Sequence, residues 1–395
     1  MAPTTRLDLM SGALAADPWP ALAELREQGP LVWHETHRLW LLTRDREIRQ
    51  VVMDFRRFTL EGTPSAELFG AEAFISIDDR ARHDALRGVW ADAFRLPALE
   101  PLAPVLRHMI DDLLAPVVEE LRAGRPIDLV RALCRPLPTL AIAHMMGVPG
   151  QMMDKVVAWS DQMAAGGPAY GRDASVVDAR EAAKSALADY LRELMQARRR
   201  SPRDDLVSKL VHAEVAGGLT DGQIVENARQ LLFAGAETTA KWLAQLFLTY
   251  GRRPDLQRQL AADRSLIPAA NDEVMRWQGV VGTMGRRVRG GDVELGGVTL
   301  RDGDRMTCLL ASAGRDPDRY EDPDTLDIYR RREPNLGFGV GLHHCLGINL
   351  AKLEAELAVA ALLDRIPAFE IAAPCSFSSL PLRGPQPVVI ARAVR

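Results

Sequence analysis

One long proline-free segment constrains the fold more than any other stretch of this sequence. Thr220 and Gln223 fit a capping box, in which each side chain bonds the other residue's backbone N–H, so a helix should begin at Asp221. No proline follows before about Tyr250. A helix of this length spans about 45 Å, enough to cross a whole domain. The other elements must therefore pack around it.

The middle of this predicted helix has an unusual sequence, Ala234-Gly235-Ala236-Glu237-Thr238. Glycine lowers helix stability, and a carboxylate in a buried helix needs a partner. Thr238 can bond back to a carbonyl of the preceding turn and open a groove in the helix. The non-functional interpretation is that Glu237 is exposed to solvent and Thr238 caps a helix. This interpretation does not suit two residues in the middle of a helix. Because broken local rules often mark function, we interpret the segment as functional.

A glycine-rich loop from Phe338 to Gly347 delivers Cys345 to the start of a helical segment, Ile348 to Asp364. Gly339 and Gly341 permit a tight turn and can aim backbone N–H groups at whatever Cys345 carries. A thiolate is favoured near a helix N-terminus. The loop therefore predicts a functional cysteine.

Several roles are open for Cys345 from these residues alone. A zinc site with His343 and His344 is disfavoured, because adjacent ligands strain tetrahedral geometry. A nucleophile needs a histidine base and an oxyanion hole. An axial thiolate ligand of haem iron suits a loop that lies flat against a macrocycle. A structural role is the fourth possibility, and we adopt it for the other cysteines, Cys134, Cys308 and Cys375.

The complete pattern Phe-Gly-x-Gly-x-His-x-Cys-x-Gly resembles the haem-binding signature of the cytochrome P-450 family. The resemblance covers about residues 15 to 393. It implies a mainly α (α+β) fold, helix-rich with small β-sheets around a buried haem, in a single catalytic domain over residues 1–395. Haem b (iron protoporphyrin IX) would be ligated by Cys345, in a loop that also supplies Phe338, Gly339 and Gly347.

The same resemblance implies roles for the middle of the long helix. There Ala234 and Gly235 leave room for dioxygen over the iron. Glu237 relays protons, and Thr238 supplies a hydrogen bond at the oxygen site.

Basic side chains are expected to hold the haem propionates. His83 and Arg87 lie four residues apart on one predicted helix face, which could simply be a solvated face. In the resemblance this His-x-x-x-Arg pair binds a propionate, as do Arg287 from a small sheet and His343 beside the cysteine. Guanidinium groups suit such anions.

A structural network is expected beneath the haem. Glu273 and Arg276 share a helix face, and Arg330 completes their network in the resemblance. Two positions depart from the family pattern: Gly314 stands where Asn is usual, and Asn335 where His often precedes the haem loop.

Composition and charge exclude some classes of protein. The formal net charge is −4 and the pI is near 6.1, whereas nucleic-acid-binding proteins are usually basic. Met1 to Leu14 lacks the basic start and apolar run of a signal peptide, and no membrane anchor is evident. Four cysteines without paired spacing fit a reducing compartment. We expect a cytoplasmic protein.

The implied activity is a monooxygenase reaction on a hydrophobic small molecule, by hydroxylation, epoxidation or oxidative demethylation with dioxygen. No fused reductase is expected, so electrons should come from a separate ferredoxin and ferredoxin reductase, and NAD(P)H acts only indirectly. A monomer is expected. Two alternatives remain: a peroxide-driven peroxygenase, which typically lacks the acid and hydroxyl pair, and a non-catalytic haem-based sensor or carrier.

Three surface features complete these expectations. Arg331, Arg332 and Lys352 could steer an acidic electron carrier, or could simply aid solubility. Gly166 to Pro168 corresponds to a lid over the substrate channel in the resembling family. The candidate substrate pocket is mostly apolar and comprises Phe233, residues 280–284, residues 58–75 and residues 378–382.

Overall fold

The computed structural model describes residues 2–63, 66, 69–165, 174–215, 218–331 and 333–393. The predicted lid at Gly166 to Pro168 lies outside these residues. The helices are α1 (Gly12–Ala16), α2 (Trp19–Gln28), α3 (Asp45–Met53), α5 (Arg80–Ala91), α6 (Leu96–Leu99), α7 (Ala103–Arg122), α8 (Pro136–Met145), α9 (Met153–Ala165), α10 (Ala174–Arg200), α11 (Leu206–Val211), α12 (Asp221–Arg252), α13 (Pro254–Ala262), α14 (Ile267–Gln278), α15 (Leu310–Ala313) and α16 (Ile348–Arg365).

The strands are short and come mainly from the two ends of the chain. They are β1 (Thr4–Thr5), β2 (Leu31–His34), β3 (Leu39–Leu42), β4 (Phe58–Thr59), β5 (Ile127–Asp128), β6 (Met284–Val288), β7 (Val293–Leu295), β8 (Val298–Leu300), β9 (Arg305–Cys308), β10 (Phe369–Ile371), β11 (Ser376–Phe377), β12 (Pro385–Gln386) and β13 (Val389–Arg392). None of the described helices is long and apolar enough to cross a membrane.

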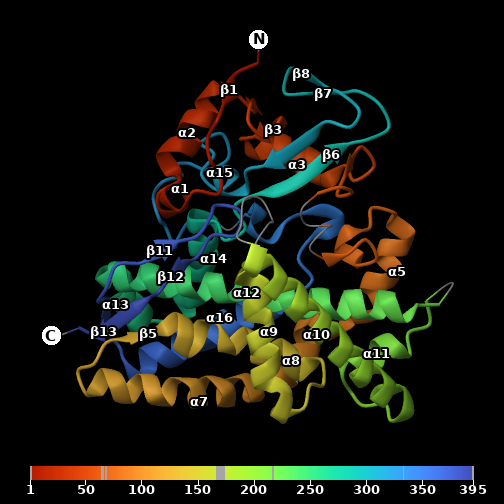
Figure 1. The fold of residues 1–395 in the computed structure, drawn as a ribbon. Coiled ribbons are helices and arrows are strands. Elements are labelled where there is room, and N and C mark those ends of the chain that lie inside the picture. Colours follow the sequence, from red (N-terminus) through yellow and green to blue (C-terminus); the bar gives the residue numbers. More distant parts are fainter. Residues whose placement is uncertain are drawn as a thin grey trace.

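The molecule has a sheet-containing part and a larger helical part, drawn at the top and bottom of Figure 1. The largest sheet has the strand order β1-β2-β3-β9-β6-β4. Its β2–β3 hairpin pairs Leu31 with Leu42. β10, β13 and β5 form a second sheet, and β7–β8 and β11–β12 form two hairpins. This arrangement agrees with the predicted helix-rich fold with small sheets.

The long helix α12 runs through the helical part (Figure 1). Its 32 residues begin with the predicted capping box of Thr220 and Gln223 and end two residues beyond the predicted terminus. At 1.5 Å per residue its length is about 48 Å. Its C-terminal half is almost fully buried against α7, α14 and α16.

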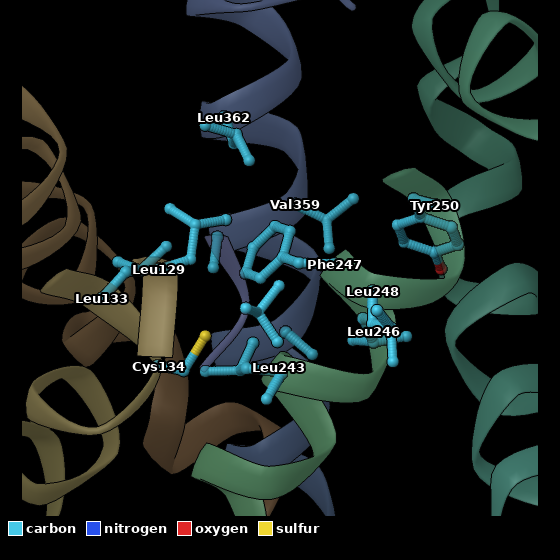
Figure 2. Close-up of a cluster of buried hydrophobic side chains, with 14 of the residues drawn as sticks. Leu129, Leu133, Cys134, Leu243, Leu246, Phe247, Leu248, Tyr250, Val359 and Leu362 are labelled. Atoms are coloured by element: carbon cyan, nitrogen blue, oxygen red, sulfur yellow. The ribbon is translucent and has the colours of Figure 1, made fainter. Parts of the chain in front are cut away.

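Figure 2 shows part of this core, in which α12 contributes Leu243 and Phe247. These residues face Leu133 from the turn before α8, and Val359 from α16. All four side chains are no more than 1% exposed. The cluster fixes α12 against α16, the helix that follows the cysteine loop.

Prolines lie where two stretches of helix are divided. The helix α6 ends at Leu99 and α7 begins at Ala103; Pro101 lies between them and Pro104 lies in the first turn of α7. Residues 130–146 likewise consist of a π-helical turn at Val130–Cys134 and then α8, which starts at Pro136. Proline lacks a backbone N–H, so it suits a first helical turn better than an interior.

Candidate active site

The cysteine loop contains two single helical turns, Leu336–Phe338 and Gly341–His343. Gly339 and Gly341 have φ angles of 67° and 73°, a region in which side chains other than glycine are strained. The backbone N–H of Cys345 donates to the carbonyl of Phe338 at 2.9 Å. The loop therefore closes on itself and presents Cys345 three residues before α16.

Burial raises the pKa of the Cys345 thiol, while the Gly347 backbone N–H and the Arg87 charge act in the opposite direction. The predicted helix-terminus effect alone does not overcome burial here. A bound metal cation removes a thiol proton outright. The thiol therefore suits a metal ligand better than a free nucleophile.

Two buried histidines meet beside the loop. The rings of His83 on α5 and His343 are perpendicular, with centroids 5.1 Å apart. His83 Nδ1 lies 3.0 Å from Asp84 Oδ1, whereas His83 Nε2 and both ring nitrogens of His343 have no hydrogen-bond partner. Burial is the largest cause that lowers the pKa of each histidine. The structure thus places His83 of α5 against His343 of the cysteine loop.

A buried carboxylate also faces His343. Asp78 Oδ1 lies 3.6 Å from His343 Nε2, which is too far for a hydrogen bond. Asp78 accepts a hydrogen bond from Thr59 Oγ1 and another from the Leu60 backbone N–H. Burial acts to raise the pKa of Asp78, but its contacts with His343, Thr59 and Leu60 lower it overall.

The structure brings Arg286, rather than Arg287, to this group. Successive residues of β6 point to opposite faces, so Arg286 is 2% exposed while Arg287 is exposed. Burial lowers the pKa of Arg286, and the charge of Asp78 acts against that effect. Arg286 also acts electrostatically on His343. A propionate contact by Arg287 stays a prediction, and Arg286 joins the candidates.

The donors around Cys345 fit the carboxylates of a haem. Both ring nitrogens of His343 are buried without a hydrogen-bond partner, so this ring has an N–H free to donate, and the half-buried Arg87 lies close enough to interact with Cys345. Buried polar groups are normally satisfied, so these orphaned atoms indicate an anionic ligand. Within the described ranges, no group of three His, Cys, Asp or Glu side chains could hold a metal ion, which leaves the zinc alternative without a ligand set.

The central segment of α12 has the expected bond from Thr238 to the preceding turn, within a continuous helix. Thr238 Oγ1 donates to the Ala234 carbonyl at 2.8 Å. Glu237 is 14% exposed and its Oε1 lies 3.0 Å from Lys241 Nζ, one turn further along. A Cβ on Gly235 would lie 3.3 Å from Ile142, so this glycine permits the close approach of α8. The places of Ala234 and Gly235 at a cofactor stay predictions.

Aromatic contacts connect α12 to the cysteine loop. The Trp242 ring meets the Phe338 ring edge-on, with centroids 5.5 Å apart at 81°. On the other side, Lys352 Nζ lies 5.7 Å from the Phe338 ring centroid and 2.8 Å from Asp272. Lys352 is thus already paired, which weakens its predicted role in carrier docking. Arg331 is exposed, and Arg332 lies outside the described residues.

Polar side chains of α12 hold the loop before α5, within the predicted pocket. The Glu226 carboxylate accepts the Glu72 backbone N–H at 3.0 Å, and Asn227 Oδ1 accepts that of Phe74 at 2.9 Å. Asn227 Nδ2 donates back to the Glu72 carbonyl at 3.0 Å. The ring of Phe233 from α12 meets that of Phe69, with centroids 6.0 Å apart. The loop is therefore fixed to the same helix that carries Glu237.

The predicted structural network is present. Arg276 forms two hydrogen bonds to Glu273, at 2.6 and 2.8 Å, and both side chains are at most 6% exposed. Arg330 Nε lies 3.3 Å from the same carboxylate. Arg276 also donates to the carbonyls of Gly314 and Pro323. The network ties α14 to the segment that leads to the cysteine loop.

Sequence reasoning missed two functional candidates, Lys241 and Arg286. The spacing of Glu237 and Lys241 is an i, i+4 pattern that could have revealed their ion pair. No sequence pattern distinguishes Arg286 from Arg287, because two adjacent arginines in a strand differ only in which face of the sheet is buried.

Comparisons with known proteins agree with this geometry. The sequence model of the cytochrome P-450 family matches residues 173–372. Mycinamicin IV hydroxylase/epoxidase of Micromonospora griseorubida is 34% identical over 85% of this chain and 84% of that protein. Nocardicin C N-oxygenase of Nocardia uniformis subsp. tsuyamanensis is 35% identical over 91% of both chains. The crystal structure of CalO2 has a TM-score of 0.89 and 30% identity, and the match covers 98% of this chain and 99% of CalO2.

The chain belongs to the cytochrome P-450 family and is a monooxygenase of that family. The predicted family, helix-rich fold and enzyme class are thereby confirmed. The family implies a haem cofactor.

Proposed function

We propose that this enzyme binds haem b through Cys345 and inserts one atom of dioxygen into a hydrophobic organic small molecule. The observation that carries the proposal is the set of buried ring nitrogens of His83 and His343 that have no hydrogen-bond partner beside the Cys345 loop. Hydroxylation, epoxidation and oxidative demethylation are the candidate reactions. The names of two relatives, a hydroxylase/epoxidase and an N-oxygenase, support oxygen insertion.

Each residue of the site has a proposed task toward that cofactor. Cys345 Sγ ligates the iron, within the loop formed by Phe338, Gly339 and Gly347. When bound, a thiolate-ligated haem supplies the oxygen-activating chemistry. The propionates are held by basic residues, namely His83, Arg87, His343 and Arg286, with Arg287 at the exposed edge.

The distal side of the site is assigned to α12. The Thr238 hydroxyl is oriented by its bond to the Ala234 carbonyl and forms a hydrogen bond at the site where dioxygen binds. Glu237 carries the protons that the reaction consumes, which is a task for a positioned acid. Ala234 and Gly235, which have a small side chain and none, leave room for dioxygen beside this part of the helix. An intact Glu237 and Thr238 pair supports a dioxygen-dependent oxygenase over a peroxide-driven one.

Electrons come from a separate ferredoxin and its NAD(P)H-dependent reductase in this proposal. Residues 1–395 act as one catalytic domain, as a monomer in the cytoplasm. The exposed Arg331 can attract an acidic carrier. Reversal of this charge by Arg331→Glu should slow electron transfer and weaken its salt dependence. Unchanged rates and salt dependence would remove Arg331 from the docking surface.

A carbon monoxide spectrum tests the cofactor assignment. The reduced protein should give the strongly red-shifted absorbance of a thiolate-ligated haem, and Cys345→Ala should abolish it. Cys375→Ala is the matched control, because Cys375 is a half-buried cysteine outside the loop. Absence of the band in the unchanged protein, or its persistence in Cys345→Ala, would contradict the proposal.

Substrates can be sought by a compound screen for the spin-state shift of the ferric Soret band. With a substrate found, Thr238→Ala should separate the consumption of reductant from product formation. Unchanged coupling would remove the assigned task of Thr238. A protein that is reduced and binds oxygen but turns over no ligand of the screen would instead favour the sensor or carrier alternative.

A further inference from the structure

One buried arginine, Arg383, joins three parts of the fold that are far apart in the sequence. Its Nε donates to the Ala15 carbonyl of α1 at 2.6 Å. Its Nη1 donates to the Gln278 carbonyl at 2.7 Å and to the Gln278 side chain at 2.8 Å, at the end of α14. Its own carbonyl accepts a hydrogen bond from Gln245 Nε2 of α12 at 3.0 Å. The arginine therefore connects α12 and α14 to residues 9–19, which we name the N-terminal segment.

The environment of Arg383 is unusual for a buried cation, because no carboxylate of the described residues accepts a hydrogen bond from it. The residue is 2% exposed, and its acceptors are the carbonyls of Ala15, Ala16 and Gln278 and the Gln278 amide oxygen. Burial lowers the pKa of Arg383 to about 9, and the charge of Arg315 acts in the same direction. Carbonyls at a helix C-terminus favour a cation, as at the end of α14. The guanidinium therefore depends on several backbone segments that must stay in place together.

Aromatic rings hold the guanidinium of Arg383 as well. Its Cζ lies 4.5 Å from the ring centroid of Phe377 and 5.2 Å from that of Trp19. The Trp19 ring also contacts a second arginine, Arg315, whose Cζ lies 3.4 Å from the ring centroid. The face of an aromatic ring attracts such cations. Phe377 directly precedes residues 378–382, which we name the C-terminal turn, and Arg383 directly follows them, so the contact between the two side chains closes the base of this turn.

The N-terminal segment supports one side of the C-terminal turn. The backbone N–H of Leu380 donates to the Leu9 carbonyl at 3.1 Å. The Leu380 side chain is fully buried, and it belongs to the same apolar cluster as Leu9. A Cβ on Gly12 would lie 2.7 Å from the Phe377 carbonyl oxygen, so Gly12 permits the close approach of α1 to β11 that is visible at the left of Figure 1. The tip and the base of the turn both rest on the start of the chain.

Residues 280–284 support the other side of the C-terminal turn. The Gly282 N–H donates to the Pro381 carbonyl at 3.1 Å, and the Arg383 N–H donates to the Val280 carbonyl at 2.7 Å. These two bonds run in opposite directions and pair the two backbones. The same arginine holds the end of α14, just before Val280, with its side chain. The relative position of the two stretches is therefore fixed by Arg383 through both its backbone and its side chain.

We propose that Arg383 is a positioning residue of the substrate pocket, which sets the shape of the pocket by holding the C-terminal turn against residues 280–284 and the N-terminal segment. The proposal rests on the proposed function, in which the turn and residues 280–284 line the pocket. Arg383 acts through these two stretches, and its own side chain needs no contact with substrate. The N-terminal segment, which lies outside the predicted pocket, thereby becomes a determinant of which molecules fit.

The test uses two ligands of haem iron that differ in size, imidazole and 4-phenylimidazole, and needs no substrate. Both bind iron through a ring nitrogen, but only the phenyl group extends to the pocket walls. The Kd of each is measured in the full haem-loaded protein from the shift of the Soret band. In Arg383→Gln, the Kd of 4-phenylimidazole should rise by about tenfold or more, the effect of lost packing against one wall of an apolar pocket. The Kd of imidazole should change by less than about twofold, because this ligand does not reach that wall.

Arg198→Gln is the matched control for the loss of a buried arginine. Arg198 is 4% exposed and bonds Asp205 and the Gly147 carbonyl, outside the predicted pocket. This variant should lower the unfolding temperature and leave the ratio of the two Kd values unchanged. Arg383→Lys keeps the charge but lacks the fork that reaches separate carbonyls, so it should behave like Arg383→Gln. A wild-type ratio in both Arg383 variants, even with a lower unfolding temperature, would show a purely structural role and overturn the proposal.

Leu9→Ala tests the N-terminal segment while Arg383 stays in place. It removes apolar contacts in the cluster that contains Leu380, so the Kd of 4-phenylimidazole should again rise relative to that of imidazole. Leu256→Ala is the control, because Leu256 is a buried leucine of α13 in a different cluster. An unchanged ratio in Leu9→Ala would overturn the inference, and this result decides the question if Arg383→Gln does not fold. If imidazole gives no Soret shift even in the unchanged protein, the proposed haem site fails and the inference falls with it.

Discussion

Replacement of Glu354 by glutamine should make the stability of the enzyme less dependent on pH. Glu354 lies on α16, nine residues after Cys345, and is 1% exposed. Its Oε2 has no hydrogen-bond partner, and burial raises its pKa well above the ordinary value. The folded protein therefore keeps the proton of this side chain to a higher pH than the unfolded chain does.

The sign and size of the effect follow from proton linkage. An unfolded glutamate titrates near about pH 4.3, so above this pH the unfolded chain releases a proton that the folded chain keeps. The stabilisation is fully present below that pH and is lost as the pH rises toward the folded pKa. Between the unfolded and the folded pKa the loss is about 1.4 kcal/mol per pH unit, which sets an upper limit of about 2.7 kcal/mol between pH 5.5 and pH 7.5. Glutamine has nearly the same shape and no such dependence.

Urea unfolding followed by tryptophan fluorescence at these two pH values measures the difference. Glu354→Gln should gain stability relative to the wild type as the pH rises, by up to about 2.7 kcal/mol. Glu119→Gln on α7 is the control, because it changes an exposed carboxylate and should have the same small effect at both pH values. If wild type and Glu354→Gln lose the same stability between pH 5.5 and pH 7.5, Glu354 is ionised in the folded protein and the reasoning is refuted.

Other stability predictions use the same unfolding assay. Glu273→Ala leaves the buried Arg276 without its carboxylate and should cost about 3–5 kcal/mol; a cost below 1 kcal/mol would show that the guanidinium finds other partners. Gly282→Ala should cost about 1–3 kcal/mol, because its Cβ would lie 2.2 Å from the Leu380 carbonyl oxygen. Gly88→Ala, at an exposed position inside α5 with open space around it, should stabilise by about 1 kcal/mol. Equal effects of the two alanines would contradict the contact argument.

Local sequence signals predicted much of the fold. The capping box at Thr220 and Gln223 placed the start of α12, because such a cap needs only residues three apart. The glycines of the cysteine loop predicted a tight turn, and Gly339 and Gly341 have the positive φ angles that require them.

The candidate site was predictable where its chemistry lies within one segment. Cys345 and the bond from Thr238 to Ala234 are of this kind. The side of β6 that carries the buried arginine was not predictable, since it depends on the register of β6 with β4 and β9. Asp161 of α9 and Glu237 of α12 line one cavity, which depends on the packing of α9 against α12, and no pattern in either helix specifies that packing.

The hydrogen bonds between α12 and the loop before α5 have a consequence for exchange of amide protons. The N–H groups of Glu72 and Phe74 belong to an irregular segment but are held by Glu226 and Asn227. In deuterium oxide these two amides should be retained far longer than those of ordinary loops. Exchange of these two amide protons requires the loop before α5 to separate from α12. Their exchange rate would therefore report how often this part of the predicted pocket opens.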